Sequence, residues 1–163
     1  MATDCLIKAP MEYEVLKQNR FLMRFPSDLG IMEWWISKAS RPGWQVGKTE
    51  IPFLNTKTYV AGKYEWNEIN VTLRNPIGPS ATQAVMEWVR LCTESVTGRM
   101  GYAVSYIRDI ELQVLDPNNA AVELWILKNT MLVSAKFGNL DYSQDGLIET
   151  DLVLQPQYCI LSY

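Results

Sequence analysis

The chain has 163 residues, of which 48% are hydrophobic and 20% charged, so it has the size and composition of one globular domain rather than of a disordered segment. Its net charge of −3 at pH 7 argues against general nucleic-acid binding, which needs a basic surface. It contains no histidine, the commonest general base and zinc ligand, and no apolar run approaches the roughly 18 residues that span a bilayer.

The amino terminus lacks the basic stretch and apolar core of a signal peptide, so we expect a protein that folds in the cytoplasm. The three cysteines are widely spaced, odd in number and without a Cys-x-x-Cys motif. Two interpretations of them stay open. They are incidental thiols, or Cys5 or Cys159, near the two termini, forms a disulfide between neighbouring copies.

The first predicted strand follows an irregular arm of about residues 1–19. Alternation in residues 20–25 places Phe21, Met23 and Phe25 on one face. A turn is expected at residues 27–30, and residues 32–39 are expected to form the returning strand.

Residues 51–62, with the sequence IPFLNTKTYVAG, are predicted to form a polar loop that carries large apolar side chains. Residues 63–74 then alternate strictly, which predicts one long strand with Ile69, Val71 and Leu73 on its buried face. A monomeric enzyme has little use for exposed apolar residues beside a sheet edge, whereas a subunit that binds copies of itself does. The opposite face of the strand is polar and consists of Glu68, Asn70, Thr72 and Arg74.

One helix is predicted, beginning after Ser80, with Gln83 completing a capping box. Val85, Trp88 and Val89 recur at helical spacing, which is typical of an amphipathic helix packed on a sheet. Gly98 is expected to cap its carboxyl end.

Strands are predicted over residues 103–115 and 121–128, joined by a turn at residues 116–119. A last pair, residues 131–137 and 147–155, is expected to meet at a tight Asp145-Gly146 turn. In the second of these strands Glu149 and Asp151 face away from the apolar side. The predicted fold is mainly β with one main helix, a β-sandwich or partial barrel in a single domain.

No catalytic, metal or cofactor site is predicted. Residues 141–146 match the first half of a calcium-binding EF-hand loop, but Leu152 stands where a bidentate glutamate is required. Asp109 and Glu111 share a strand face and are a formal acid/base pair, although two such carboxylates on a surface strand are usually just solvated.

Several segments, in this order along the chain, resemble the tail tube protein of contractile-tailed bacteriophages, a family related to the tubes of contractile injection systems and type VI secretion. The resemblance covers about residues 21–158. The segments that carry it are residues 36–43 (ISKASRPG), 51–62, 66–73 (WNEINVTL), the helix with Trp88, and the closing hairpin from 138–142 to 149–154.

The resemblance implies a structural protein without enzymatic activity or cofactors. Six copies would form a ring whose strands join into one continuous β-barrel, and rings would stack into the inner tail tube of the virion, which conducts DNA during ejection. The implied partners are other copies of the chain, the sheath, baseplate and tail terminator proteins, and the tape measure protein and DNA in the lumen. Residues 159–163 depart from the family, because they extend past its usual end as a short carboxyl-terminal extension.

The resemblance and the strand alternation together give two sets of candidate residues. The candidates for contact between successive rings are Pro52, Phe53, Leu54, Asn55, Lys57 and Tyr59. The candidates for lining the lumen are Glu68, Asn70, Thr72, Glu149 and Asp151, whose mostly acidic character would keep DNA from binding the wall.

Three other interpretations stay open. The tube of an injection or type VI secretion system, carrying protein, fits the same residues. A β-sandwich module that binds sugars or a cell surface would use Trp34, Trp44 or Trp125 as a platform. An enzyme is the third choice, disfavoured by the missing histidine.

Overall fold

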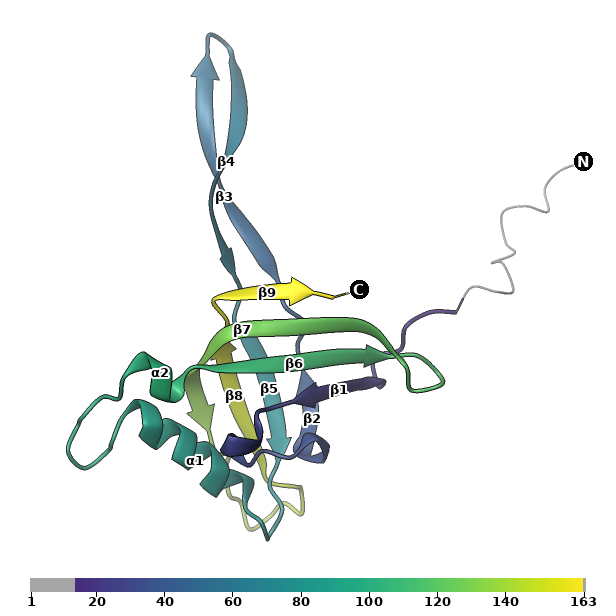
Figure 1. Ribbon diagram of the computed structural model, residues 1–163, viewed down its shortest axis with the longest axis vertical. Helices are drawn as coiled ribbons and strands as arrows, with labels where there is room; N and C mark the ends of the chain where they lie inside the picture. The colour runs from purple at the N-terminus through teal and green to yellow at the C-terminus, as the bar shows by residue number, and fades with distance from the viewer. Residues whose placement is uncertain (1–13, 163) are drawn as a thin grey trace, which may run out of the picture.

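The computed structural model describes residues 14–162, and its largest element is a strongly bent antiparallel sheet (Figure 1). The strand order is β1-β6-β7-β8-β5-β2, and β9 pairs with β7 beside this path. A separate two-stranded hairpin projects from the sheet. The strands are β1 (Phe21–Arg24), β2 (Ile36–Ala39), β3 (Trp44–Phe53), β4 (Thr56–Trp66), β5 (Ile69–Arg74), β6 (Arg108–Leu115), β7 (Ala121–Lys136), β8 (Glu149–Gln155) and β9 (Tyr158–Leu161).

Strand β7 joins the two halves of the sheet because it pairs with β6 and β9 along its first part and with β8 along its second. Its register shifts against β6 between Leu127 and Thr130, where Asn129 has a left-handed φ of 51°. A second shift lies between Leu132 and Ser134. Such bulges bend a strand and increase its twist, so β7 turns one layer over the other.

The core lies between these layers. The alternating residues Ile69, Val71 and Leu73 of β5 are buried, as predicted. They pack in one cluster with Leu152 and Leu154 of β8, Ile110 and Leu112 of β6, and Val85 and Trp88 of helix α1 (Ala81–Cys92). Each such side chain contributes roughly 1.5–3 kcal/mol by its removal from water. The mainly β fold with one main helix is confirmed, and the described residues of a single chain form no closed barrel.

The predicted returning strand at residues 32–39 is wrong in its first half and in its partner. Trp34 and Trp35 lie in a short 3-10 turn, η2 (Glu33–Trp35), which follows another, η1 (Ser27–Leu29). These turns redirect the chain, so β2 pairs with β5 and β1 pairs with β6.

The loop at residues 51–62 and the single strand at 63–74 are also corrected. Residues 44–66 form one β-hairpin, whose strands β3 and β4 are joined at Leu54 and Asn55. The Asn67 N–H donates to Gly43 O at 2.8 Å and closes the base of the hairpin, and the chain then enters the large sheet at Ile69.

Helix α1 is confirmed and begins after Ser80 as predicted, but neither of the predicted caps forms. The Ser80 side chain makes no capping hydrogen bond, so the capping box is absent. The helix ends at Cys92 rather than at Gly98, because Thr93 is extended and forms a bridge with Met100.

The later elements differ in their limits. Residues 103–106 form a short helix, α2 (Ala103–Tyr106), ahead of β6, and the two strands predicted over 121–137 are one strand. Strands β7 and β8 do pair, but residues 137–148 join them as a long loop, without the tight turn expected at Asp145-Gly146. The expected carboxyl-terminal extension contributes strand β9. No helix in residues 14–162 is long and apolar enough to cross a membrane.

Candidate assembly surfaces

The β3–β4 hairpin stands away from the rest of the molecule and presents two unlike faces (Figure 1). The register pairs Ile51 with Thr58, Thr49 with Val60 and Phe53 with Thr56, which places three apolar side chains and three threonines on one face near the tip. Phe53 is 71% exposed and Leu54, in the turn, 90%. A two-stranded ribbon is marginally stable in water alone. Its apolar face therefore requires cover that residues 14–162 of a single chain do not provide.

The opposite face of the hairpin is charged. Lys57 Nζ lies 2.8 Å from Glu50 Oε1, and Lys48 Nζ lies 5.2 Å from the centre of the Tyr59 ring. These contacts link the two strands across the ribbon. They make the hairpin amphipathic, with one face suited to water and the other to a protein surface.

Glycines allow the hairpin strands to twist about each other. A Cβ at Gly62 would stand 3.0 Å from Gly47 O, a closer approach than other residues readily accept. The register shifts between Val46 and Lys48, beside this close approach. At the base, the Gln155 side chain donates to Trp66 O at 2.9 Å and ties the hairpin to β8.

The predicted inter-ring residues all lie in the outer half of this hairpin, but on different faces. Phe53 lies on the apolar face, whereas Pro52, Lys57 and Tyr59 lie on the charged one. Prediction from the sequence missed Ile51 and Val60, which complete the apolar face. The signal that identifies them is alternation on both sides of the Leu54-Asn55 turn, which is concealed when residues 51–62 are interpreted as a loop.

Four of the predicted lumen residues come together on one face of the β5–β8 pair. Thr72 is opposite Asp151, and the Thr72 hydroxyl donates to Asp151 Oδ1 at 2.8 Å. Asn70 lies beside this pair and Glu149 lies opposite Arg74. Glu68 lies outside the strands, in the exposed link between β4 and β5.

The same sheet face also carries positive charge that the sequence did not reveal. Lys38 of β2 pairs in register with Thr72, and Lys136 of β7 with Asp151. With Arg74, three basic residues accompany Glu149 and Asp151. The face is therefore mixed in charge rather than mostly acidic, because flanking strands supply the lysines.

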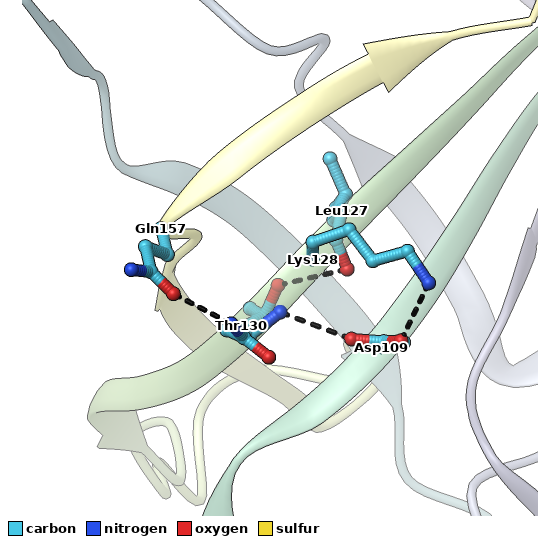
Figure 2. Close-up of polar contacts among 6 residues, drawn as sticks. Asp109, Leu127, Lys128, Thr130 and Gln157 are labelled. Atoms are coloured by element: carbon cyan, nitrogen blue, oxygen red, sulfur yellow. Dashed lines mark hydrogen bonds and ion pairs between the residues drawn. The ribbon is translucent and has the colours of Figure 1, made fainter.

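One member of the carboxyl pair considered from the sequence, Asp109, has a structural role at the bend of β7. Figure 2 shows Asp109 of β6 beside Lys128, whose Nζ donates to Asp109 Oδ2 at 2.8 Å. The Asn129 N–H donates to the other carboxylate oxygen at 3.0 Å. The Lys128 hydrogen bond, followed by that from Asn129, lowers the pKa of Asp109, and the same contact raises the pKa of Lys128. Asp109 thus holds the bulge in place.

The thiols give no support to a disulfide. Cys5 lies outside the described residues, while Cys92 and Cys159 are free. Cys159 is opposite Leu127 and packs against the core, and burial raises its pKa to about 11. The proposed disulfide through Cys5 or Cys159 stays a prediction. Within the described residues, no group of three cysteine or carboxylate side chains is placed to hold a metal ion.

The tryptophans proposed as a sugar platform come from three elements. Trp34 is 62% exposed and packs edge-to-face on Trp35, and Trp44 is opposite Trp66 at the base of the hairpin. Trp125 packs against the core and donates to Glu123 Oε2 at 3.2 Å. Trp125 thus faces inward, whereas Trp34 and Trp44 are exposed on separate elements.

A further exposed apolar group lies at the end of the molecule opposite the hairpin (Figure 1). We define the loop pole as residues 75–80 and 138–148, which a backbone hydrogen bond joins from Asn75 N–H to Ile148 O at 3.1 Å. Its exposed apolar side chains are Ile77, Leu140, Tyr142 and Leu147.

Comparison with known proteins identifies the fold. No protein-family model and no curated protein matches the chain. Among solved structures, it is similar to a chain of the anti-feeding prophage tube-terminating cap (TM-score 0.74, 13% identity, 99% of both chains). It is also similar to a chain of an extracellular contractile injection system sheath–tube complex in the extended state (0.69, 11%, 93% of both chains).

The SPP1 tail tube is similar as well, with a TM-score of 0.51 and 11% identity over 87% of this chain and 74% of that one. The chain therefore has the tube-protein fold of phage tails and contractile injection systems. The resemblance inferred from the sequence is confirmed at the level of fold.

Proposed function

We propose that the chain is a structural tube subunit of a contractile machine and not an enzyme. Six copies close into a ring, and rings stack into a hollow tube. A sheath surrounds the tube, and baseplate and terminator proteins bind its ends. The observation that carries this proposal is the projecting hairpin, whose apolar face is left uncovered by the described part of the chain.

The open sheet supports the ring. Among the described strands, β1 and β2 each pair on one side only, and so leave backbone hydrogen-bonding groups free at the sheet margin. A hollow of about 410 Å³ lies between them, lined by residues that include Phe21, Lys38 and Val114. Joining such margins between copies into a closed barrel removes free edges, which otherwise invite uncontrolled association.

The cargo has two candidates. In a phage tail the tube conducts DNA, and the polar face with Asn70, Thr72, Glu149 and Asp151 lines the channel, with Glu68 at its margin. A tube that carries protein is the second candidate, favoured by the higher TM-scores with injection-system chains and by the mixed charge of that face.

Electron microscopy of the purified full-length chain tests the proposal. We expect rings or hollow rods in negative stain, and light scattering well above the mass of a monomer. Phe53→Asp should abolish rods, because a charge on the apolar face of the hairpin opposes its burial, while circular dichroism stays unchanged.

Val104→Asp is the matched control, because Val104 is 90% exposed outside both the hairpin and the loop pole. It should assemble normally. A monodisperse monomer of the unaltered chain at all concentrations would contradict a tube function.

A further inference from the structure

The hollow between β1 and β2 lies where the large sheet is open. The strand path begins at β1 and ends at β2, and both strands lie on the same side of the molecule (Figure 1). Among residues 14–162, neither strand has a second neighbour in the sheet. The hollow of about 410 Å³ is lined from both strands, by Phe21 of β1 and by residues 37–39 of β2. Free strand edges beside a hollow can bind an extended segment as an added strand.

The lining of this hollow is apolar and basic. Its apolar residues include Phe21, Ala39, Leu112 and Val114. Its charged residues are Lys17, Arg20, Lys38 and Arg41. Of these four, only Arg41 forms an ion pair within the described part of the chain, with Glu123. The hollow therefore suits a segment that has an apolar side and carries acidic residues.

The amino-terminal arm has such a segment. Residues 1–13, which lie outside the described residues, have the sequence MATDCLIKAPMEY. In residues 3–9, Cys5 and Ile7 share one side of an extended chain, and two of the three residues on the other side are charged. Pro10 then ends the run. Two of the three charged side chains in the arm are acidic, opposite in sign to those of the hollow.

The course of the chain directs the arm toward a neighbouring copy. Residues 14–20 leave the sheet beside β1 (Figure 1). Leu16, Lys17 and Gln18 themselves form one wall of the hollow. Residues 10–20 span up to roughly 36 Å when extended, whereas a compact domain of this length has a radius of gyration of roughly 15 Å. The arm is therefore long enough to cross from one subunit to the next.

We propose that residues 3–9 of one copy enter the hollow of the neighbouring copy as an added strand, with Cys5 and Ile7 on its apolar side. This inference rests on the proposed ring and adds the segment that joins each subunit to the next. Every copy then donates one arm and accepts another. Because donor and acceptor are different surfaces, the contact repeats around a ring and ends where the ring closes. It also covers strand edges that would otherwise invite uncontrolled association.

Disulfide formation tests this contact in the full-length chain. Cys92 and Cys159 are replaced by serine, the native Cys5 is kept, and Ala39→Cys is introduced in the hollow. Mild oxidation should produce a ladder of linked copies on a non-reducing denaturing gel, ending at six. Cys5 alone can link only two copies, so bands above the dimer require the second cysteine.

The matched control carries Ala103→Cys in place of Ala39→Cys. Ala103 is exposed at the start of α2, on the other side of the molecule from β2 (Figure 1). This variant should give at least tenfold less material above the dimer. An equal ladder in the control would overturn the inference. So would loss of both thiols from monomers without a ladder, since the arm would then return to its own hollow.

Two substitutions within the arm test which side of the strand faces the hollow. Added to the Ala39→Cys chain, Ile7→Asp should reduce the ladder at least tenfold, because it places a charge against apolar residues. Leu6→Asp, on the opposite side of the same run, should leave the ladder intact. Equal effects of the two substitutions would contradict an inserted strand.

Electron microscopy of the same samples separates this inference from the tube function. Rods that form without the Ala39→Cys ladder would overturn the donated strand and leave the tube standing. A ladder without rings or rods would support the donated strand and refute the tube. Neither ladder nor rods would refute both.

Discussion

Asp109 shows how a single exposed residue sets the shape of the sheet. Its carboxylate binds both Lys128 and the Asn129 N–H at the bulge where β7 bends. Because these bonds lower the pKa of Asp109 below 3.8, the stability they provide is present above that value and is lost as pH falls through the folded-state pKa. The pKa of Lys128 is raised above 10.5, so the stability that Lys128 contributes is fully present below that value. This stability is lost only as pH rises through the folded-state pKa of Lys128.

Asp109→Ala should therefore lower the free energy of unfolding at neutral pH, and the deficit should shrink as the pH is lowered toward about 2. The free energy of unfolding of Asp109→Asn should lie between those of the unaltered chain and Asp109→Ala, because the amide oxygen still accepts from the Asn129 N–H while the charge is gone. Urea unfolding at both pH values measures this. A deficit of the same size in acid would mean that the carboxylate charge contributes nothing.

Cys159 gives a second prediction at the residue scale. Burial raises the pKa of its thiol to about 11, so little thiolate exists near neutral pH. With Cys5 and Cys92 replaced by serine, alkylation of Cys159 by iodoacetamide at about pH 8 should be at least tenfold slower in the folded chain than in urea. The unaltered chain on a non-reducing gel tests the disulfide, which requires a dimer band that Cys5→Ser or Cys159→Ser removes.

At the scale of elements, helix α1 is held on the sheet by Trp88. The side chain is almost fully buried, and its indole N–H donates to Tyr106 O at 2.8 Å, which also fixes α2. Trp88→Phe removes that donor and part of the packed volume, and should cost about 1–3 kcal/mol of unfolding free energy. Trp34→Phe, at an exposed position, should cost about 0.5 kcal/mol or less. Equal losses for the two variants would contradict the assigned role.

The elements also show which features the sequence reveals. Alternation in β5 and β8 and helical spacing around Trp88 are local signals, and they predicted the core correctly. The hairpin was missed because its glycines and polar residues resemble a loop, and its apolar face appears only when β3 and β4 are in register. Lys38 and Lys136 lie on the polar face because their strands, β2 and β7, flank β5 and β8 in the sheet. No local sequence pattern encodes this strand order.

The termini of the elements were predicted least well, because contacts distant in sequence decide them. Thr93 ends α1 by bridging to Met100, although Gly98 offers the expected capping residue. Likewise, Asn129 continues β7 through a bulge held by Asp109, where the sequence suggested a break between two strands.

At the scale of the whole molecule, the charge of the β5–β8 face decides what the proposed channel conducts. Three basic residues accompany Glu149 and Asp151 there. Duplex DNA carries one charge per roughly 1.7 Å, so a wall of uncompensated lysine would hold it, whereas on this face Glu149 and Asp151 offset two of the three positive charges. Glu149→Lys combined with Asp151→Lys should leave rods intact and convert the channel into a DNA-binding one.

Nuclease protection locates that binding. Rods of the double variant, assembled with a short labelled duplex at low salt, should shield it from added nuclease, and shielding should fall steeply as salt rises. Glu87→Lys with Glu94→Lys changes the charge equally around α1, outside the proposed lumen, so any DNA it binds should be digested. Protection by this control, or digestion with the Glu149/Asp151 variant, would place the β5–β8 face outside the channel.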